Sequence, residues 1–244
     1  MYIMFWSLFS NITDKEREEA IATIIKHASP RHEFFFMMML SVSMAVFGVL
    51  LNSTVVIIGS MLIAPMLYPL LSLGLGIIMP DEQLMARSII TLGKATGLSL
   101  LVGFVIGLFF SGAVSGPSSV VDIIAGGQPS LLYAAVAVIA GFAGAFAMTR
   151  PHLNETLPGV AISVALVPPL AVAGVGLAHF DWAVASHALV LFLANVIGVT
   201  FAAVVVFSLF GFSRKRKVAE QEVKKDEKAV AAEVKEAHKP AASA

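Results

Sequence analysis

Residues 52–76 read NSTVVIIGSMLIAPMLYPLLSLGLG and carry the strongest structural signals in the chain. They open with asparagine, serine and threonine, residue types that cap the unpaired backbone N–H groups at the start of a helix. The apolar run continues to Met79, far enough to cross a bilayer as a helix that rises about 1.5 Å per residue. The sequence therefore predicts a membrane-spanning segment over residues 54–79.

Pro65 and Pro69 lie near the middle of this segment. A proline inside a helix removes one backbone hydrogen bond and clashes with the carbonyl four residues earlier, at a cost of about 3 kcal/mol. In a bilayer the freed backbone groups are tolerated only where protein, water or a ligand satisfies them. We therefore predict a helix that is broken at mid-membrane depth, beside a polar partner rather than beside lipid.

The same residues carry a family resemblance. From Asn52 to Pro69 the chain follows the pattern Asn-Ser-x-x-Val-Ile-Ile-Gly-x-Met-Leu-Ile-Ala-Pro-x-x-x-Pro. This pattern resembles the signature of an uncharacterised hydrophobic membrane family, domain-of-unknown-function family 389, and the flanking hydrophobic plan fits from about Phe34 to Gly211. The resemblance implies a multi-span membrane protein and no particular activity, so function has to be argued from the residues.

The composition indicates an all-α polytopic membrane protein. Of the 244 residues, 58% are hydrophobic and 13% are charged, whereas a soluble domain carries about a quarter charged residues. Long apolar segments recur along the chain, and the formal net charge is zero. The sequence contains no cysteine, which excludes disulfides and thiolate metal sites.

We predict six transmembrane helices, at residues 34–51, 54–79, 88–111, 130–149, 157–178 and 182–211. Lysine and arginine are absent from every second connection, namely 52–53, 112–129 and 179–181. All basic residues then fall on one side of the membrane, as the positive-inside rule requires when both termini are cytoplasmic. An odd number of spans would destroy this agreement. We therefore expect a multi-pass protein of the cell membrane.

The two ends of the chain are predicted to lie outside the transmembrane domain of residues 34–211. Residues 1–33 contain a capping box at Thr13–Glu16 followed by an amphipathic helical pattern, which predicts a helix on the cytoplasmic face. Residues 212–244 begin with a basic cluster suited to anionic lipid. The remaining charged tail is typical of either a solvated single helix or a disordered segment.

The two halves of the domain resemble each other, as repeat 1 at about 34–111 and repeat 2 at about 130–211. The fifth span carries paired prolines near its middle, as the second does, and each span follows an asparagine, Asn154 or Asn52. Because each half holds three spans, the repeats would have opposite orientations in the bilayer. Such inverted repeats with proline-broken helices point to a transporter-type site at the repeat interface. The alternative is a chance likeness between spans whose kinks merely aid packing.

The candidates for a solute pathway are the residues at the breaks and the polar side chains near them. They are Ser60, Pro65, Tyr68, Pro69, Ser72, Ser163, Pro168, Pro169, Asn195 and Lys94. A broken helix offers free N–H groups to an anion and free carbonyls to a cation. For a serine the alternative is a hydrogen bond to its own helix, for Asn195 a bridge between helices, and for Lys94 an extended side chain that reaches the cytoplasmic interface.

Small residues at four-residue spacing predict close helix packing or oligomer contacts. They are Gly93, Gly97, Gly103, Gly107, Ala137, Gly141 and Ala145. We find no catalytic motif, metal site, cofactor motif or nucleic-acid-binding pattern, and no carboxylate lies inside a span. The expected partners are the lipid bilayer, an unidentified small solute or ion, and further copies of the chain in a homo-oligomer.

Two functions fit these patterns. The first is a transporter or channel for a small solute, with the broken helices at mid-membrane depth. The second is a non-transporting scaffold or signalling component that acts through its cytoplasmic termini. The paired mid-span prolines favour the first, while the glycine-rich seams and the charged tail fit either.

Overall fold

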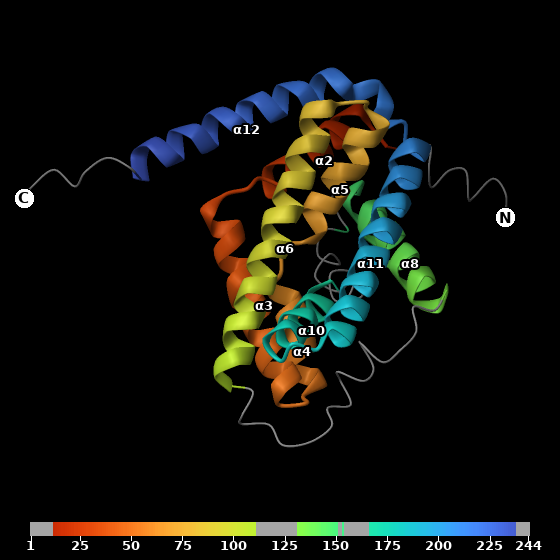
Figure 1. Cartoon of the computed structure of the whole chain (residues 1–244). Helices are drawn as coiled ribbons and strands as arrows, with labels where there is room; N and C mark the ends of the chain where they lie inside the picture. Colours follow the sequence, from red (N-terminus) through yellow and green to blue (C-terminus); the bar gives the residue numbers. More distant parts are fainter. Residues whose placement is uncertain (1–11, 111–130, 151–152, 154–165, 238–244) are drawn as a thin grey trace, which may run out of the picture.

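The computed structural model describes residues 12–110, 131–150, 153 and 166–237 of the chain (Figure 1). Within these residues every regular element is a helix. The predicted all-α class is therefore confirmed for the part of the chain that the structure describes.

The N-terminal amphipathic helix is α2, Asp14–His27. Its capping box forms as predicted, because the backbone N–H of Glu16 donates to the Thr13 hydroxyl (3.3 Å) and that of Thr13 donates to the Glu16 carboxylate (2.7 Å). The face that carries Ile21 and Ile24 is buried. The helix is thus held by an apolar face that packs on the rest of the protein.

The first half of the apolar domain contains four helices. These are α3 (His32–Leu50), α4 (Thr54–Ile63), α5 (Leu67–Ile78) and α6 (Glu82–Phe110). The chain is bent by 52° where α4 gives way to α5, so the predicted second span consists of two helices. The helix that contains the predicted third span begins before residue 88, at Glu82, where Asp81 caps α6 by accepting a hydrogen bond from the Leu84 backbone N–H (3.0 Å).

The second half is described in part. It contains α8 (Leu131–Met148), α10 (Val167–Ala178) and α11 (Trp182–Leu209). The predicted first part of the fifth span lies outside the described residues, and so does Ser163.

Three of these helices are long and apolar enough to cross a membrane on their own, namely α3, α6 and α11. The bent pair of α4 and α5 passes the same test if it counts as one span, which brings the total to four. Helix α10 and the apolar part of α8 at Ala135–Met148 are shorter. The chain therefore has the helices of a membrane protein, while six spans stay a prediction.

The corner between α5 and α6 recurs between α10 and α11, one hundred positions later. In the first corner the N–H of Asp81 donates to the Gly76 carbonyl (3.1 Å), and in the second the N–H of Asp181 donates to the Gly176 carbonyl (2.9 Å). The side chain of Asp181 then caps α11 by accepting from the Val184 N–H (3.1 Å), as Asp81 caps α6. The first corner lies at the end of the bundle near α12, and the second lies at the opposite end (Figure 1).

After α11 the chain turns at Gly211, whose φ of 69° lies in the left-handed region that favours glycine. A short 3-10 helix, Phe212–Lys215, leads into α12, Arg216–Ala237. Helix α12 crosses one end of the bundle and extends beyond it (Figure 1). One face of α12 is buried at Ala219 and Val223, so this part of the tail is a packed helix and matches neither predicted alternative, a solvated single helix or a disordered segment.

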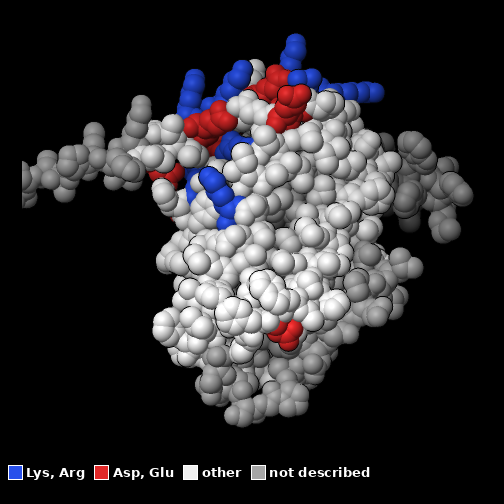
Figure 2. Space-filling model, in the orientation of Figure 1, with Lys and Arg blue, Asp and Glu red and all other residues white. Residues whose placement is uncertain are grey.

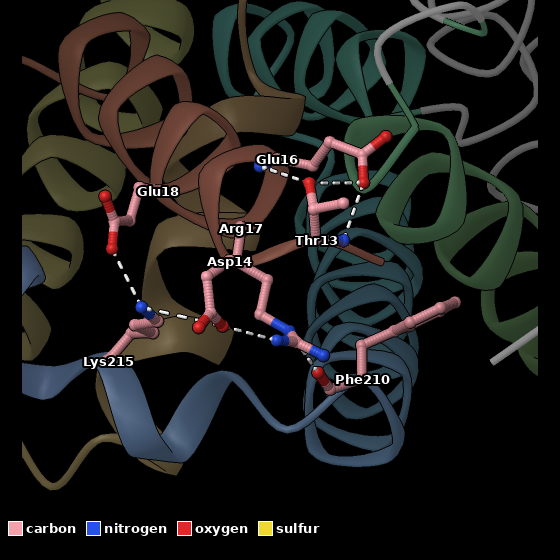
Figure 3. A network of polar contacts seen from close by, with 7 residues as sticks. All are labelled: Thr13, Asp14, Glu16, Arg17, Glu18, Phe210 and Lys215. Carbon is pink, nitrogen blue, oxygen red and sulfur yellow. Dashed lines mark hydrogen bonds and ion pairs between the residues drawn. The ribbon is translucent and has the colours of Figure 1, made fainter. Parts of the chain in front are cut away.

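Charged side chains gather at the end of the molecule where α12 lies, and the flank below carries few (Figure 2). Ion pairs join the elements at this end. Arg17 of α2 donates to the Asp14 carboxylate (2.7 Å) and to the Phe210 carbonyl that ends α11 (3.0 Å) (Figure 3). Lys215 donates to Glu18 (2.8 Å), a bond that raises the pKa of the lysine. The charged side chains at this end of the molecule, called the charged layer below, therefore hold α2 against the end of α11.

Candidate functional site

The break between α4 and α5 is the centre of the candidate site. Helix α4 ends at Ile63, which leaves the last four carbonyls of that helix without partners within it. One of them, the Ser60 carbonyl, accepts a hydrogen bond from the buried Ser41 hydroxyl of α3 (2.7 Å). The break is thus supported by a polar side chain from a neighbouring helix.

The Ser60 side chain makes a hydrogen bond to its own helix, which was the alternative to a place in a solute pathway. It is fully buried and its hydroxyl donates to the Ile57 carbonyl of its own helix (2.6 Å). In the next helix Ser72 is also buried, and its hydroxyl lies 2.9 Å from that of Ser88 on α6. Both predicted serines therefore have protein partners in this conformation.

Pro65 is half-buried and opens onto the charged end of the molecule. It lines a cavity of about 270 Å³ with Ile63, with residues of α2 and with the start of α3. Tyr68, three residues further on, stacks on the ring of His27 at 4.8 Å between centroids and an angle of 25°. The break is therefore in contact with the N-terminal helix, which the sequence alone did not predict.

The remaining prolines occupy helix starts. Pro69 lies in the first turn of α5, and Pro168 and Pro169 lie in the first turn of α10. A proline is tolerated there because its missing N–H would have no partner within the helix. All three are buried. Each therefore lies at the start of a helix that the structure describes.

The other two polar candidates lie on different helices. Asn195 is buried on α11, with 5% of its surface exposed, and Lys94 is exposed on α6. None of the three residues Ser60, Tyr68 and Asn195 lines the cavity beside Pro65 or a second cavity between α2 and α12. A common polar cavity between these three residues stays a prediction.

The small-residue faces divide into buried and open ones. Gly103 of α6 crosses Gly174 of α10 so closely that a Cβ on Gly174 would lie 2.6 Å from the Gly103 Cα. Gly107 packs against Val175 and Ala178 of the same partner helix. These two predicted faces therefore join α6 and α10 within one chain.

The face of α8 is also used within the chain. A Cβ on Gly141 would lie 2.7 Å from the Cα of Val199 on α11, and a Cβ on Gly198 of α11 would lie 3.0 Å from the Cβ of Ala137. Ala145 is buried as well. By contrast, Gly93 and Gly97 on α6 have open space in front of them. Of the predicted seams that the structure describes, the one at Gly93 and Gly97 is left available to a further copy of the chain.

Sequence reasoning missed Ser41, His27 and the two capping aspartates. Asp81 and Asp181 did give a signal, because an aspartate directly before a long apolar helix is a typical N-cap. Ser41 and His27 gave none, since each becomes meaningful only through a partner that is distant along the chain.

Comparison with known proteins gives a family and one relative. The family described as a domain of unknown function (DUF389) matches residues 61–201. An uncharacterized protein of Methanocaldococcus jannaschii is 31% identical over 211 residues, which cover 86% of this chain. The match spans 64% of the length of that relative. No solved structure matches the chain.

Proposed function

The chain belongs to the domain-of-unknown-function family DUF389, and from that premise we propose that it is a multi-pass membrane protein that moves a small solute or ion. The role proposed is that of a transporter or channel and not of an enzyme. The break at Pro65 supports this role, because backbone groups freed within an apolar domain need protein, water or a solute as partners.

The observation that carries the proposal is the repeated corner. The turns at Asp81 and Asp181 have the same backbone hydrogen bonds and the same side-chain cap, and they lie at opposite ends of the bundle (Figure 1). This arrangement is expected of an inverted repeat, in which one half is turned over relative to the other. The hundred-residue spacing pairs Pro69 with Pro169.

The proposed pathway runs through the break and the start of α10. Helices α5 and α10 begin at the corresponding residues Leu67 and Val167, where the positive end of the helix dipole favours an anion, although the prolines in both first turns donate no N–H. Exposed Lys94 on α6 adds to that preference. A small anion is therefore the first class of solute to test.

Liposome assays test the proposal. The purified chain should produce a current, or the uptake of labelled solute, above that of empty liposomes in a panel of ions and small metabolites, with inorganic anions measured first. If no member of the panel moves, the scaffold reading becomes the better one. The folded charged layer of α2 and α12 favours that second reading, because it offers a partner an ordered cytoplasmic surface.

The proposed topology has six spans and both termini in the cytoplasm. The charged layer at one end of the molecule supports this orientation (Figure 2). A reporter fused at Val121 should therefore lie outside the cell, while one fused at the C-terminus should lie inside. Reporters on the same side would contradict the three spans predicted between Val121 and the C-terminus, and with them the six-span topology.

A further inference from the structure

Two arginines from different helices converge on one carboxylate of α12. Arg31, which caps α3, pairs with Asp226 at 2.8 Å, and Arg87 of α6 pairs with the other oxygen of the same carboxylate. The Ser29 hydroxyl accepts a hydrogen bond from Arg87 (2.8 Å). The group therefore has the composition of an anion-binding site, with an aspartate of the protein in the place of the ligand.

The site is buried and has more positive than negative charge. Side-chain exposure is 7% for Asp226, 12% for Arg87 and 25% for Arg31. Two guanidinium groups face a single carboxylate. Among the described residues, Arg31 Nε and Arg87 Nη1 are buried without a hydrogen-bond acceptor, and an unpaired buried donor costs about 1–3 kcal/mol or more when it is charged. The site would therefore be better satisfied by a ligand with more acceptor oxygens.

A phosphate group is such a ligand. It carries more negative charge and more acceptor oxygens than a carboxylate, and arginine binds it in the same forked geometry. A cavity of about 380 Å³ adjoins the site between α2 and α12. The basic residues of its lining are Lys26, Arg31 and Lys225, and the acidic ones are Asp226 and Glu222, of which Glu222 pairs with Lys225 (3.5 Å). Space and positive charge for a phosphate are thus present beside the carboxylate that it would replace.

We propose that Arg31, Arg87 and Ser29 form a phosphate-binding site in which Asp226 acts as an internal competitor, so that phosphate binding releases α12. The release is feasible because few apolar side chains anchor this helix, chiefly Ala219 and Val223. Release without a substitute is disfavoured, since two partly buried arginines would lose the carboxylate with which both pair. The exchange is independent of any solute movement through the membrane domain.

Acid is not the trigger of this exchange. Burial would raise the pKa of the Asp226 carboxyl, but hydrogen bonds from the two arginines and Ser29 outweigh it and hold that pKa below its ordinary value. The stabilisation is therefore fully present above the ordinary aspartate pKa, and it is lost only as the pH falls through the lowered value. Two titratable groups face this carboxyl directly, Arg31 and Arg87. The others line the adjoining cavity, namely Lys26, His27, Glu222 and Lys225.

Hydrogen–deuterium exchange of α12 in the full-length protein tests the proposal. In phosphate-free detergent, sodium phosphate should accelerate exchange in residues 216–237 by at least about tenfold and should saturate, whereas sodium chloride of equal ionic strength should not. Asp226→Asn should exchange rapidly without phosphate. Glu220→Gln, which removes an ion pair to Arg216 within the same helix, should behave as the natural chain does.

The affinity of the protein for inorganic phosphate is measured by calorimetry. Asp226→Asn should bind phosphate at least about tenfold more tightly than the natural chain, and Arg87→Gln should not bind it. Circular dichroism and a thermal melt establish that each variant is folded. The proposal is overturned if Asp226→Asn leaves α12 protected, or if the response to phosphate persists in both Arg31→Gln and Arg87→Gln.

A lipid headgroup supplies the same chemistry as free phosphate, and nanodiscs separate the two sources. Release of α12 in discs that contain phosphatidic acid, but not in discs of phosphatidylcholine alone, would assign the site to an anionic lipid. Release by sodium phosphate in both kinds of disc would assign it to a free anion. Protection of α12 under all of these conditions would overturn the proposal.

Discussion

Replacing Gly174 by leucine is expected to leave little folded protein. A Cβ at this position would lie 2.6 Å from the Gly103 Cα and 3.1 Å from the Phe104 backbone nitrogen, so the neighbouring helix α6 would have to move as a whole. Overpacking of this kind costs about 1–3 kcal/mol or more, and here it also separates two backbones whose close approach holds α6 against α10. The measurement is the unfolding temperature and the monodisperse yield in detergent.

Gly97→Leu is the matched control, because Gly97 lies on the same helix as Gly103 and has open space in front of it. Its unfolding temperature should stay close to that of the natural chain. A change in assembly size alone would assign the Gly93 and Gly97 face to a contact between copies. Equal stability of Gly174→Leu and Gly97→Leu would contradict the crossing of α6 and α10.

Signals that lie close together in the sequence predicted most of the helices. The capping box at Thr13 and the apolar periodicity that follows it define α2, and Pro65 marks the end of α4 within two residues. Each of these features acts through backbone chemistry within one or two helical turns. The start of α2 and the end of α4 could therefore be predicted without knowledge of the tertiary structure.

The partners of the candidate site were not predictable in this way. Ser41 and Ser60 are joined across two helices, and the residue that pairs with Arg31 is Asp226, near the far end of the chain. In the sequence Asp226 is one acid within a tail of mixed charges, with nothing that distinguishes it from its neighbours. Only the packing of α12 across the bundle shows that this carboxylate is buried.

The role of Pro65 and Pro69 in solute movement can be tested with a variant in which α4 and α5 can join into one continuous helix. In the double variant Pro65→Ala/Pro69→Ala, residues 65 and 69 regain N–H groups that can donate to the carbonyls four residues earlier, so a continuous helix becomes possible across the 52° bend. Each interior proline costs about 3 kcal/mol relative to alanine. We therefore expect a protein that stays folded and loses solute movement in liposomes by at least about tenfold, because the free groups at the break are consumed.

Pro69→Ala alone separates this effect from a general loss of packing. Pro69 lies in the first turn of α5, where its nitrogen has no helical partner as long as Pro65 keeps the break open. The single variant should therefore move solute as the natural chain does. If the double variant also transports normally while circular dichroism shows added helix, the break is not part of the pathway. A scaffold would instead show no transport in any of the three proteins, since the break would then serve only the packing of α4 and α5.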